Sequence, residues 1–270
     1  MAESRMRKYT IALLGCTGNT GKVVLRTLLA KPEYNLNIYA RSAKKLCSQF
    51  PELGDNDQVK MYIGDIHDTN VIVDCVSGAS VIICTLGSDG MSPDTILGDS
   101  AQALVNALKL LKEQKGAAWK APRLLYLSSA SENERFSAPR PRFVHWMITT
   151  AFQMGYIDLQ RAQRILLQDP SLCSLLLVQS NVLVDEPGTG SFISAEYAKL
   201  GCSYHDLGNA FVELAINDGY RKLETVAVSS RDGDKALRYA PIIATKLFLG
   251  FFVNFFPWGV QIHRFLERLW

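Results

Sequence analysis

An apolar strand, a glycine-rich turn and an amphipathic helix follow one another between residues 9 and 30, and this unit constrains the fold more than any other feature. We expect the strand over 9–14, the turn over 15–21 and the helix over 22–30, before Pro32. Such a turn presents unpaired N–H groups and the positive end of the helix dipole to an anion, and its glycines let the backbone approach a pyrophosphate. The unit predicts a dinucleotide site made by Gly15, Thr17, Gly18, Asn19, Thr20 and Gly21.

The spacing of these glycines is G-x-x-G-x-x-G, whereas the standard dinucleotide fingerprint is G-x-G-x-x-G. The alternative interpretation is an ordinary tight turn between a strand and a helix. The place of the motif, directly after a strand and before a helix, favours dinucleotide binding.

Strand and helix patterns alternate along the following residues. Apolar strand patterns recur at 35–40, 59–63, 80–86 and 123–127. Apolar residues at helical spacing recur at 70–76 and 100–112. Five strands alternating with helices predict an α/β fold: a Rossmann-like, doubly wound parallel sheet with a small C-terminal substrate-side region.

The length of 270 residues and the 48% hydrophobic composition allow one large core. We therefore expect a single NAD(P)-binding domain over 1–270, with 131–155 and 236–270 as substrate-side or interface segments.

The net charge of +3, without a dense basic stripe, argues against a nucleic-acid partner. The six cysteines form no C-x-x-C or Cys/His cluster, so we expect no metal site and reduced, buried thiols. Residues 1–8 lack the apolar core of a signal peptide, which predicts a cytoplasmic protein.

Ligands of a doubly wound sheet bind beyond the carboxyl ends of its strands. Arg41 follows the second strand, about 20 residues after the last glycine, where an acidic residue would bind a ribose 2′-hydroxyl. A cation there suits a 2′-phosphate and favours NADP(H), unless it is only the solvated start of a basic helix. Asp65 and Ile66 follow the third strand and are expected near the adenine, although Asp65 could instead cap the next helix. Leu86 and Gly87 are expected along the nicotinamide half.

Over roughly residues 9–230, the chain resembles the atypical, NmrA-like branch of the short-chain dehydrogenase/reductase superfamily. The resemblance is carried by the three glycines of the turn, Ala40-Arg41-Ser42, Gly64-Asp65, Leu127-Ser128-Ser129 and the expected sixth strand over 176–183. The chain departs from the branch at Gln179-Ser180, where an Arg-Pro pair is common. Its overall pattern looks like the averufin-oxidase-like fungal oxidoreductases of aromatic polyketide pathways. This resemblance implies an NADP-dependent oxidoreductase of secondary metabolism that acts on a hydrophobic aromatic substrate.

In this superfamily a Ser after the fifth strand holds the substrate oxygen and a Tyr transfers the proton. A Lys four residues beyond the Tyr lowers the Tyr pKa and grips the nicotinamide ribose. The resemblance assigns the serine role to Ser128 or Ser129, with Ser131 as a further candidate, and the tyrosine role to Tyr156. Gln160 occupies the lysine position. A tyrosine has a reference pKa of about 10 and needs a nearby cation to act at neutral pH, and Gln160 supplies none.

The glutamine leaves three interpretations of Tyr156 open. Tyr156 acts as a neutral hydrogen-bond donor, or another cation such as Arg161 or Arg164 replaces the lysine, or Tyr156 is an ordinary aromatic residue at a helix start. Two further functions stay open with them. One is a non-redox isomerase, dehydratase or cyclase on the same scaffold, and the other is an NmrA-like regulator that senses dinucleotides and binds a protein partner.

Residues 131–155 form a long connection between the serines and Tyr156. Long inserted loops in compact domains are usually functional or disordered. We interpret this one as a wall on the substrate side, with His145 and Trp146 facing a planar aromatic ligand.

The segment 241–260 is strongly apolar and aromatic, and it is interrupted by Lys246, Asn254 and Pro257. An amphipathic tail follows it. Three interpretations compete: an apolar lid over the substrate pocket, a contact in a homo-oligomer, and attachment to a membrane surface.

Overall fold

The computed structural model describes residues 9–54, 56–88, 91 and 93–269. Within these residues an eight-stranded sheet has the order β3-β2-β1-β4-β5-β6-β10-β8. Its strands run parallel except β8, which pairs antiparallel with β10. The strands are β1 (Tyr9–Leu14), β2 (Tyr34–Ala40), β3 (Val59–Ile63), β4 (Ala79–Cys84), β5 (Arg123–Ser129), β6 (Ser174–Ser180), β8 (Ser191–Ser194) and β10 (Thr225–Ser230). The predicted Rossmann-like, doubly wound sheet is confirmed, with its strand order reversing between β1 and β4.

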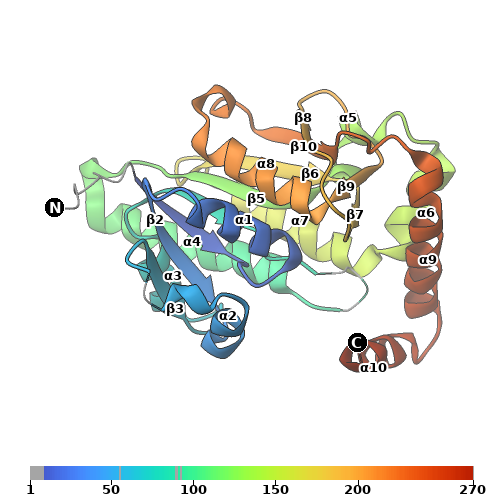
Figure 1. Cartoon of the computed structure of the whole chain (residues 1–270), viewed down its shortest axis with the longest axis horizontal. Coiled ribbons are helices and arrows are strands. Elements are labelled where there is room, and N and C mark those ends of the chain that lie inside the picture. Colours follow the sequence, from blue (N-terminus) through green and yellow to red (C-terminus); the bar gives the residue numbers. More distant parts are fainter. Residues whose placement is uncertain (1–8, 55, 89–90, 92, 270) are drawn as a thin grey trace.

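Helices cover both faces of this sheet (Figure 1). The α-helices of the described residues are α1 (Asn19–Leu29), α2 (Ala43–Gln49), α3 (Thr69–Val76), α4 (Ile96–Lys115), α5 (Glu134–Ser137), α6 (Arg142–Ala151), α7 (Gln153–Leu167), α8 (Tyr204–Ile216), α9 (Ala236–Phe255) and α10 (Gly259–Leu269). Of these, α6, α9 and α10 lie at one end of the molecule (Figure 1). α1 and α8 bury Val24 and Phe211 in a cluster on one face. α3, α4 and α7 bury Ile72, Leu104 and Leu159 on the other. The packed helices leave the ends of the strands as the places where ligands can bind.

Several element boundaries differ from the sequence prediction, and three of the differences bear on the site. α1 begins at Asn19, because Gly18 adopts an extended conformation (φ −82°, ψ 167°) and ends the turn there. β5 continues to Ser129, because it pairs with β6 as far as Ser180. The expected sixth strand over 176–183 divides into β6 and the short β7 (Val182–Val184), which pairs with β9 (Gly201–Ser203) in a separate two-stranded sheet.

The segment 131–155, expected to be a long loop, is mostly helical. It contains a 3-10 helix η3 (Ala130–Glu132), then α5, α6 and the first turn of α7. α6 packs beside α9 at one end of the molecule (Figure 1). The ring of Trp146 lies 6.4 Å from that of Phe251 on α9 and 5.8 Å from that of Phe143 on its own helix. This helix is therefore held by the C-terminal part of the chain, and Trp146 is an element of that contact.

The apolar C-terminal run forms most of α9, and its polar residues fix it to the rest of the protein. Lys246 Nζ donates a hydrogen bond to the carbonyl oxygen of Leu183 at 2.9 Å. Asn254 Nδ2 donates one to the carbonyl oxygen of Ala151, at the end of α6, at 2.8 Å. The part of the chain that the structure describes includes no helix both long and apolar enough to cross a membrane. Several aromatic side chains of α9 and the turn after it stay exposed: Phe248, Phe255, Phe256 and Trp258.

Candidate functional site

Two of the three glycines serve the close packing of the turn against β4. Gly15 has a φ of +93°, which favours glycine, and a Cβ there would lie 2.7 Å from the amide nitrogen of Leu86. A Cβ on Gly21 would lie 2.0 Å from the carbonyl oxygen of Gly15 and 2.8 Å from the hydroxyl of Thr85. Through these contacts the glycine-rich loop and the start of α1 pack closely against Thr85 and Leu86, which follow β4. The residues predicted to bind the pyrophosphate therefore lie next to those predicted to bind the nicotinamide half.

Gly18 differs, because a Cβ there would meet only the carbonyl oxygen of Gly15, at 3.4 Å. It is exposed, and no side chain caps the helix that it begins. The first amides of α1 therefore face an open place beside a glycine, which fits the pyrophosphate of a dinucleotide. Of the other predicted residues in the turn, Asn19 is exposed, Thr17 is half-buried and Thr20 is buried.

Arg41 stands exposed directly after β2, at the carboxyl edge of the sheet. The next residue, Ser42, caps α2 by accepting a hydrogen bond from the amide of Lys45 at 3.3 Å. Two further exposed lysines, Lys44 and Lys45, lie in the first turn of α2. The cations and the helix start together fit a phosphate on the adenosine ribose.

The other predicted cofactor residues also lie at this edge. Asp65 is exposed and accepts a hydrogen bond from the amide of His67 at 2.9 Å. The residue that caps α3 is Asp68, so the alternative role of Asp65 as the cap of the next helix is wrong. Ile66 is buried, and Leu86 and Gly87 continue the chain past the end of β4, with Gly87 exposed.

The hydroxyls of Ser129 and Tyr156 lie 3.4 Å apart. Ser128 has a different set of partners: its Oγ accepts hydrogen bonds from the side-chain amides of Gln163 at 2.9 Å and Gln179 at 3.3 Å. Successive side chains of a strand point to opposite faces, and β5 extends through both serines. Of the two serines at the end of β5, Ser129 is therefore the one whose hydroxyl lies near that of Tyr156. The sequence alone does not decide between Ser128 and Ser129.

In the described structure the side chains of Gln160, at the lysine position, and of Arg161 and Arg164, which the sequence offers as replacement cations, form hydrogen bonds or ion pairs with groups other than the Tyr156 hydroxyl. Gln160 is exposed and donates a hydrogen bond to the carboxylate of Glu132 at 2.9 Å. Arg161 forms an ion pair with Asp99 at 3.3 Å. Arg164 is exposed and donates from Nε to the carbonyl oxygen of Gln160 at 3.3 Å.

A different cation, Arg140, lies at the site. It is half-buried; its Nη1 donates to the Oγ of Ser131 at 2.9 Å and its Nη2 to the Oδ1 of Asn181 at 2.6 Å. Burial lowers the pKa of the Arg140 guanidinium, and the charge of Tyr156 acts in the opposite direction. Arg140 is not among the site residues that the sequence predicts. Its only local signal is its place between two prolines, which is equally typical of a turn.

The sequence predicts that His145 and Trp146 face an aromatic ligand. Trp146 is 54% exposed and packs between the rings of Phe143 and Phe251. The Nδ1 of His145 is buried without a hydrogen-bond partner among the described residues. α6 thus forms an aromatic surface together with α9.

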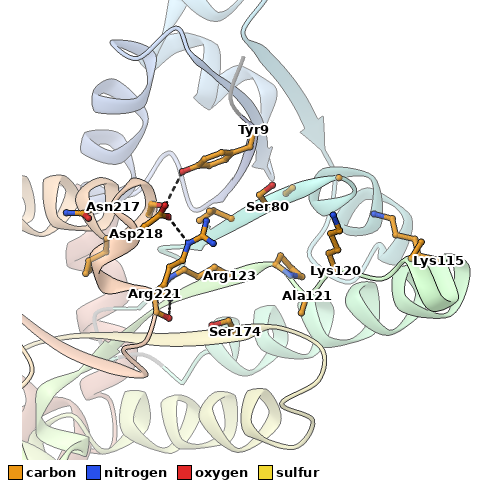
Figure 2. A pocket seen from close by; sticks show the side chains of 17 residues that line it. Tyr9, Ser80, Lys115, Lys120, Ala121, Arg123, Ser174, Asn217, Asp218 and Arg221 are labelled. Atoms are coloured by element: carbon orange, nitrogen blue, oxygen red, sulfur yellow. Dashed lines mark hydrogen bonds and ion pairs between the residues drawn. The ribbon is translucent and has the colours of Figure 1, made fainter. Parts of the chain in front are cut away.

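A cavity of about 670 Å³ opens at the opposite, amino edge of the sheet (Figure 2). It is lined by the starts of β1, β4, β5 and β6 and holds none of the predicted site residues. Two of its arginines have structural partners: Arg123 Nη2 donates to the carbonyl oxygen of Tyr220 at 2.5 Å, and Arg221 pairs with Asp218 at 2.7 Å. A second cavity, of about 420 Å³, is lined by Asn19 and other residues of α1 and lies beside the glycine turn.

The sequence profile of the NAD(P)H-binding family matches residues 15–217. The oxidoreductase aflX of Aspergillus parasiticus is 31% identical over 255 residues, covering 94% of each chain. The oxidoreductase ordB of Dothistroma septosporum is also 31% identical, covering 92% of each chain. A solved short-chain dehydrogenase/reductase of Veillonella parvula in complex with NADP has a TM-score of 0.63 at 16% identity, covering 84% of this chain and 96% of that chain. These similarities confirm the resemblance drawn from the sequence.

Proposed function

The chain belongs to the NAD(P)H-binding family and is an oxidoreductase related to these fungal proteins, and from that premise we propose a specific reaction. The protein transfers hydride between NADP(H) and a carbonyl or alcohol group of a hydrophobic, aromatic, polyketide-like substrate. The observation that carries the proposal is the 3.4 Å approach of the Ser129 and Tyr156 hydroxyls at the carboxyl edge of the sheet. Two hydroxyls so placed can both reach one substrate oxygen.

In the direction of reduction, NADPH held by the glycine turn and Arg41 would supply the hydride for the carbonyl carbon. Tyr156 donates its phenolic proton to the carbonyl oxygen, so the product is an alcohol. Ser129 donates a hydrogen bond to the same oxygen and orients it toward Tyr156. Solvent returns the proton to Tyr156 before the next turnover. The protein supplies position and proton transfer, while the cofactor carries the hydride.

The preference for NADP(H) rests on the group of cations after β2. Arg41 is exposed at the end of the strand, and Lys44 and Lys45 lie beside it in α2. A guanidinium binds a phosphate through two parallel hydrogen bonds, and the start of a helix adds a favourable dipole. NADH has no 2′-phosphate and would gain nothing from these groups.

The substrate class rests on two kinds of support. The fungal relatives are named as oxidoreductases, and the pattern of the chain resembles enzymes of aromatic polyketide pathways. The aromatic side chains of α6, Phe143 and Trp146, stay more than half exposed on the segment that connects β5 to α7. Exposed aromatic rings beside a site favour planar apolar ligands.

Fluorescence titration with NADPH and with NADH tests the cofactor assignment. We expect the parent protein to bind NADPH more tightly. We expect Arg41→Ala to lose about 10- to 100-fold of NADPH affinity, the effect of a lost charge-assisted hydrogen bond, while NADH affinity stays unchanged. Lys60→Ala is the control, because it removes one exposed positive charge from the next strand, β3. If the parent protein binds neither NADPH nor NADH, the proposed redox function is wrong.

Hydride transfer is then tested by the loss of NADPH absorbance with a panel of aromatic ketones. Tyr156→Phe should bind NADPH like the parent and turn over at least about 100-fold more slowly, because it lacks the proton donor. Turnover of a substrate without cofactor would point to an isomerase or cyclase. Tight NADPH binding with no turnover of any ketone would point to a dinucleotide-sensing regulator.

A further inference from the structure

We propose that Arg140 is a positioning residue that supplies, from outside α7, the positive charge beside Tyr156 that Gln160 cannot supply. The inference rests on the proposed function and deepens it. It assigns a role to the segment 131–155, which separates the strand serine from the tyrosine, and it accounts for a glutamine where the superfamily has a lysine.

The first support is a chain of contacts that leads from Arg140 to Tyr156. Arg140 Nη1 donates to Ser131 Oγ at 2.9 Å, and the Ser131 amide donates to Ser129 Oγ at 3.3 Å. Ser129 Oγ lies 3.4 Å from the Tyr156 hydroxyl. The guanidinium and the phenol thus both contact the short turn formed by the end of β5 and by η3, the guanidinium through Ser131 and the phenol through Ser129.

The second support is that the guanidinium is fixed. Its other terminal nitrogen donates to Asn181 Oδ1 at 2.6 Å, and Asn181 is itself tied to the carbonyl oxygen of Lys199 at 2.8 Å. Pro139 and Pro141 restrict the backbone on both sides of Arg140. A charge that is held in place and partly removed from water acts more strongly on its neighbours than a mobile surface charge does. The opposing effect of Tyr156 on the pKa of Arg140 agrees with this placement.

The third support comes from three charged groups on α7 and η3, each of which has a partner of its own. On α7, Asp158 accepts hydrogen bonds from two backbone amides of α4. Arg161 pairs with Asp99 of α4, and Glu132 of η3 accepts a hydrogen bond from Gln160. Among the described residues, Arg140 is the cation that the hydrogen-bonded chain connects to Tyr156.

Such a charge has a definite consequence for the proposed reaction. When Tyr156 gives its proton to the substrate oxygen, a phenolate remains, and a fixed cation stabilises it. Arg140 acts through this charge and through the orientation of Ser131, so it need not touch the substrate. The superfamily lysine lies one helical turn after the tyrosine, whereas Arg140 lies outside α7. Arg140 therefore takes over the charge of the lysine and not its binding of the nicotinamide ribose.

Ionisation of Tyr156 tests the inference in the protein without cofactor. Arg140→Gln removes the charge, Arg140→Lys keeps it, and Arg164→Gln removes an exposed charge of α7 as a matched control. Each protein is titrated with base while tyrosinate absorbance is recorded. The same titration of its Tyr156→Phe version is subtracted to isolate one tyrosine. We expect that tyrosine to ionise about one pH unit higher in Arg140→Gln, and to stay at the parent value in the lysine and control variants.

An unchanged midpoint in Arg140→Gln would overturn the inference, and so would an equal shift in Arg164→Gln or a failure of Arg140→Lys to keep the parent value. Arg140→Met, which keeps the apolar length of the side chain, replaces the glutamine variant if circular dichroism shows that the latter does not fold. NADPH titration of the same proteins separates the two proposals. A parent that binds no nucleotide defeats the proposed function, while the ionisation result still decides the role of Arg140.

Discussion

The carboxylate of Asp158 caps the amino end of α4, with its Oδ1 3.0 Å from the amide nitrogen of Gly98. Its Oδ2 lies 2.8 Å from the amide nitrogen of Leu97. A Cβ on Gly98 would lie 2.7 Å from the same carboxylate, so the close approach needs a glycine. Asp158 stands two residues after Tyr156 on α7. The contact therefore fixes α7 against α4 at the turn that presents the candidate proton donor.

Asp158→Ala should lower the free energy of unfolding by about 2 kcal/mol, because it leaves two helix-end amides without an acceptor. Urea unfolding followed by circular dichroism measures the change. Asp74→Ala is the control: Asp74 is exposed on α3, and its replacement should change stability by less than about 0.5 kcal/mol. Equal effects of the two substitutions would contradict the capping role.

The same carboxyl also makes stability depend on pH. Burial raises the pKa of Asp158 above its usual value, although the hydrogen bonds from Gly98 and Leu97 lower it in part. The folded protein then holds this proton more tightly than the unfolded chain, so the contribution to stability is present at low pH and is lost as pH rises through the folded value. We expect the stability of the parent relative to Asp158→Asn to fall as pH rises above about 4. A rise over that range would show that the hydrogen bonds outweigh burial.

The glycines of the turn should separate folding from binding. Gly21→Ala places a methyl group 2.0 Å from the carbonyl oxygen of Gly15, and it should lower the free energy of unfolding by about 3 kcal/mol. Gly18→Ala meets only one ordinary contact, at 3.4 Å, and should fold like the parent but bind NADPH at least about 10-fold more weakly, because the methyl occupies the space of the pyrophosphate.

Gly54→Ala is the matched control for both substitutions. Its Cβ would have no neighbour within 4 Å, and its backbone is helical (φ −61°, ψ −37°). It should raise the free energy of unfolding by at most about 1 kcal/mol and leave NADPH binding unchanged. Thermal unfolding and nucleotide titration of all three variants make the comparison. If Gly18→Ala binds NADPH as tightly as the parent does, the glycine turn serves the packing of the fold and does not bind the pyrophosphate.

Asn254→Ala should loosen α9 without unfolding the sheet. The substitution removes hydrogen bonds to the carbonyl oxygens of Ala151 and Thr150 at 2.8 and 3.3 Å. Hydrogen exchange followed by mass spectrometry should show faster exchange in α9 and α6, corresponding to about 1 kcal/mol of lost local stability, and unchanged exchange in β1 and β4. Gln261→Ala, at an exposed position of α10, is the control. Unchanged exchange in α6 would show that the two helices do not support one another.

The parts of the fold that the sequence predicted are those with a local signal. The turn with Gly15 and Gly18 and the alternation of strands and helices depend on neighbouring residues alone, and they were predicted to within a few residues. The choice between Ser128 and Ser129 required the end of β5, which is set by pairing with β6. The place of Arg140 depends on Asn181, a residue far along the chain. Contacts of this kind leave no periodic pattern in the sequence.

The helix α6 rests on a partner, α9, that is synthesised after every strand of the main sheet. Synthesis completes every strand of the main sheet at Ser230, before α9 begins at Ala236. Chains fold from the amino end as they leave the ribosome, so the sheet and its glycine turn can form while α6 still has an uncovered apolar face. Docking of α9 onto α6 therefore follows the formation of the sheet. A nascent chain halted after residue 235 would hold the nucleotide turn but would lack support for the segment that carries Arg140.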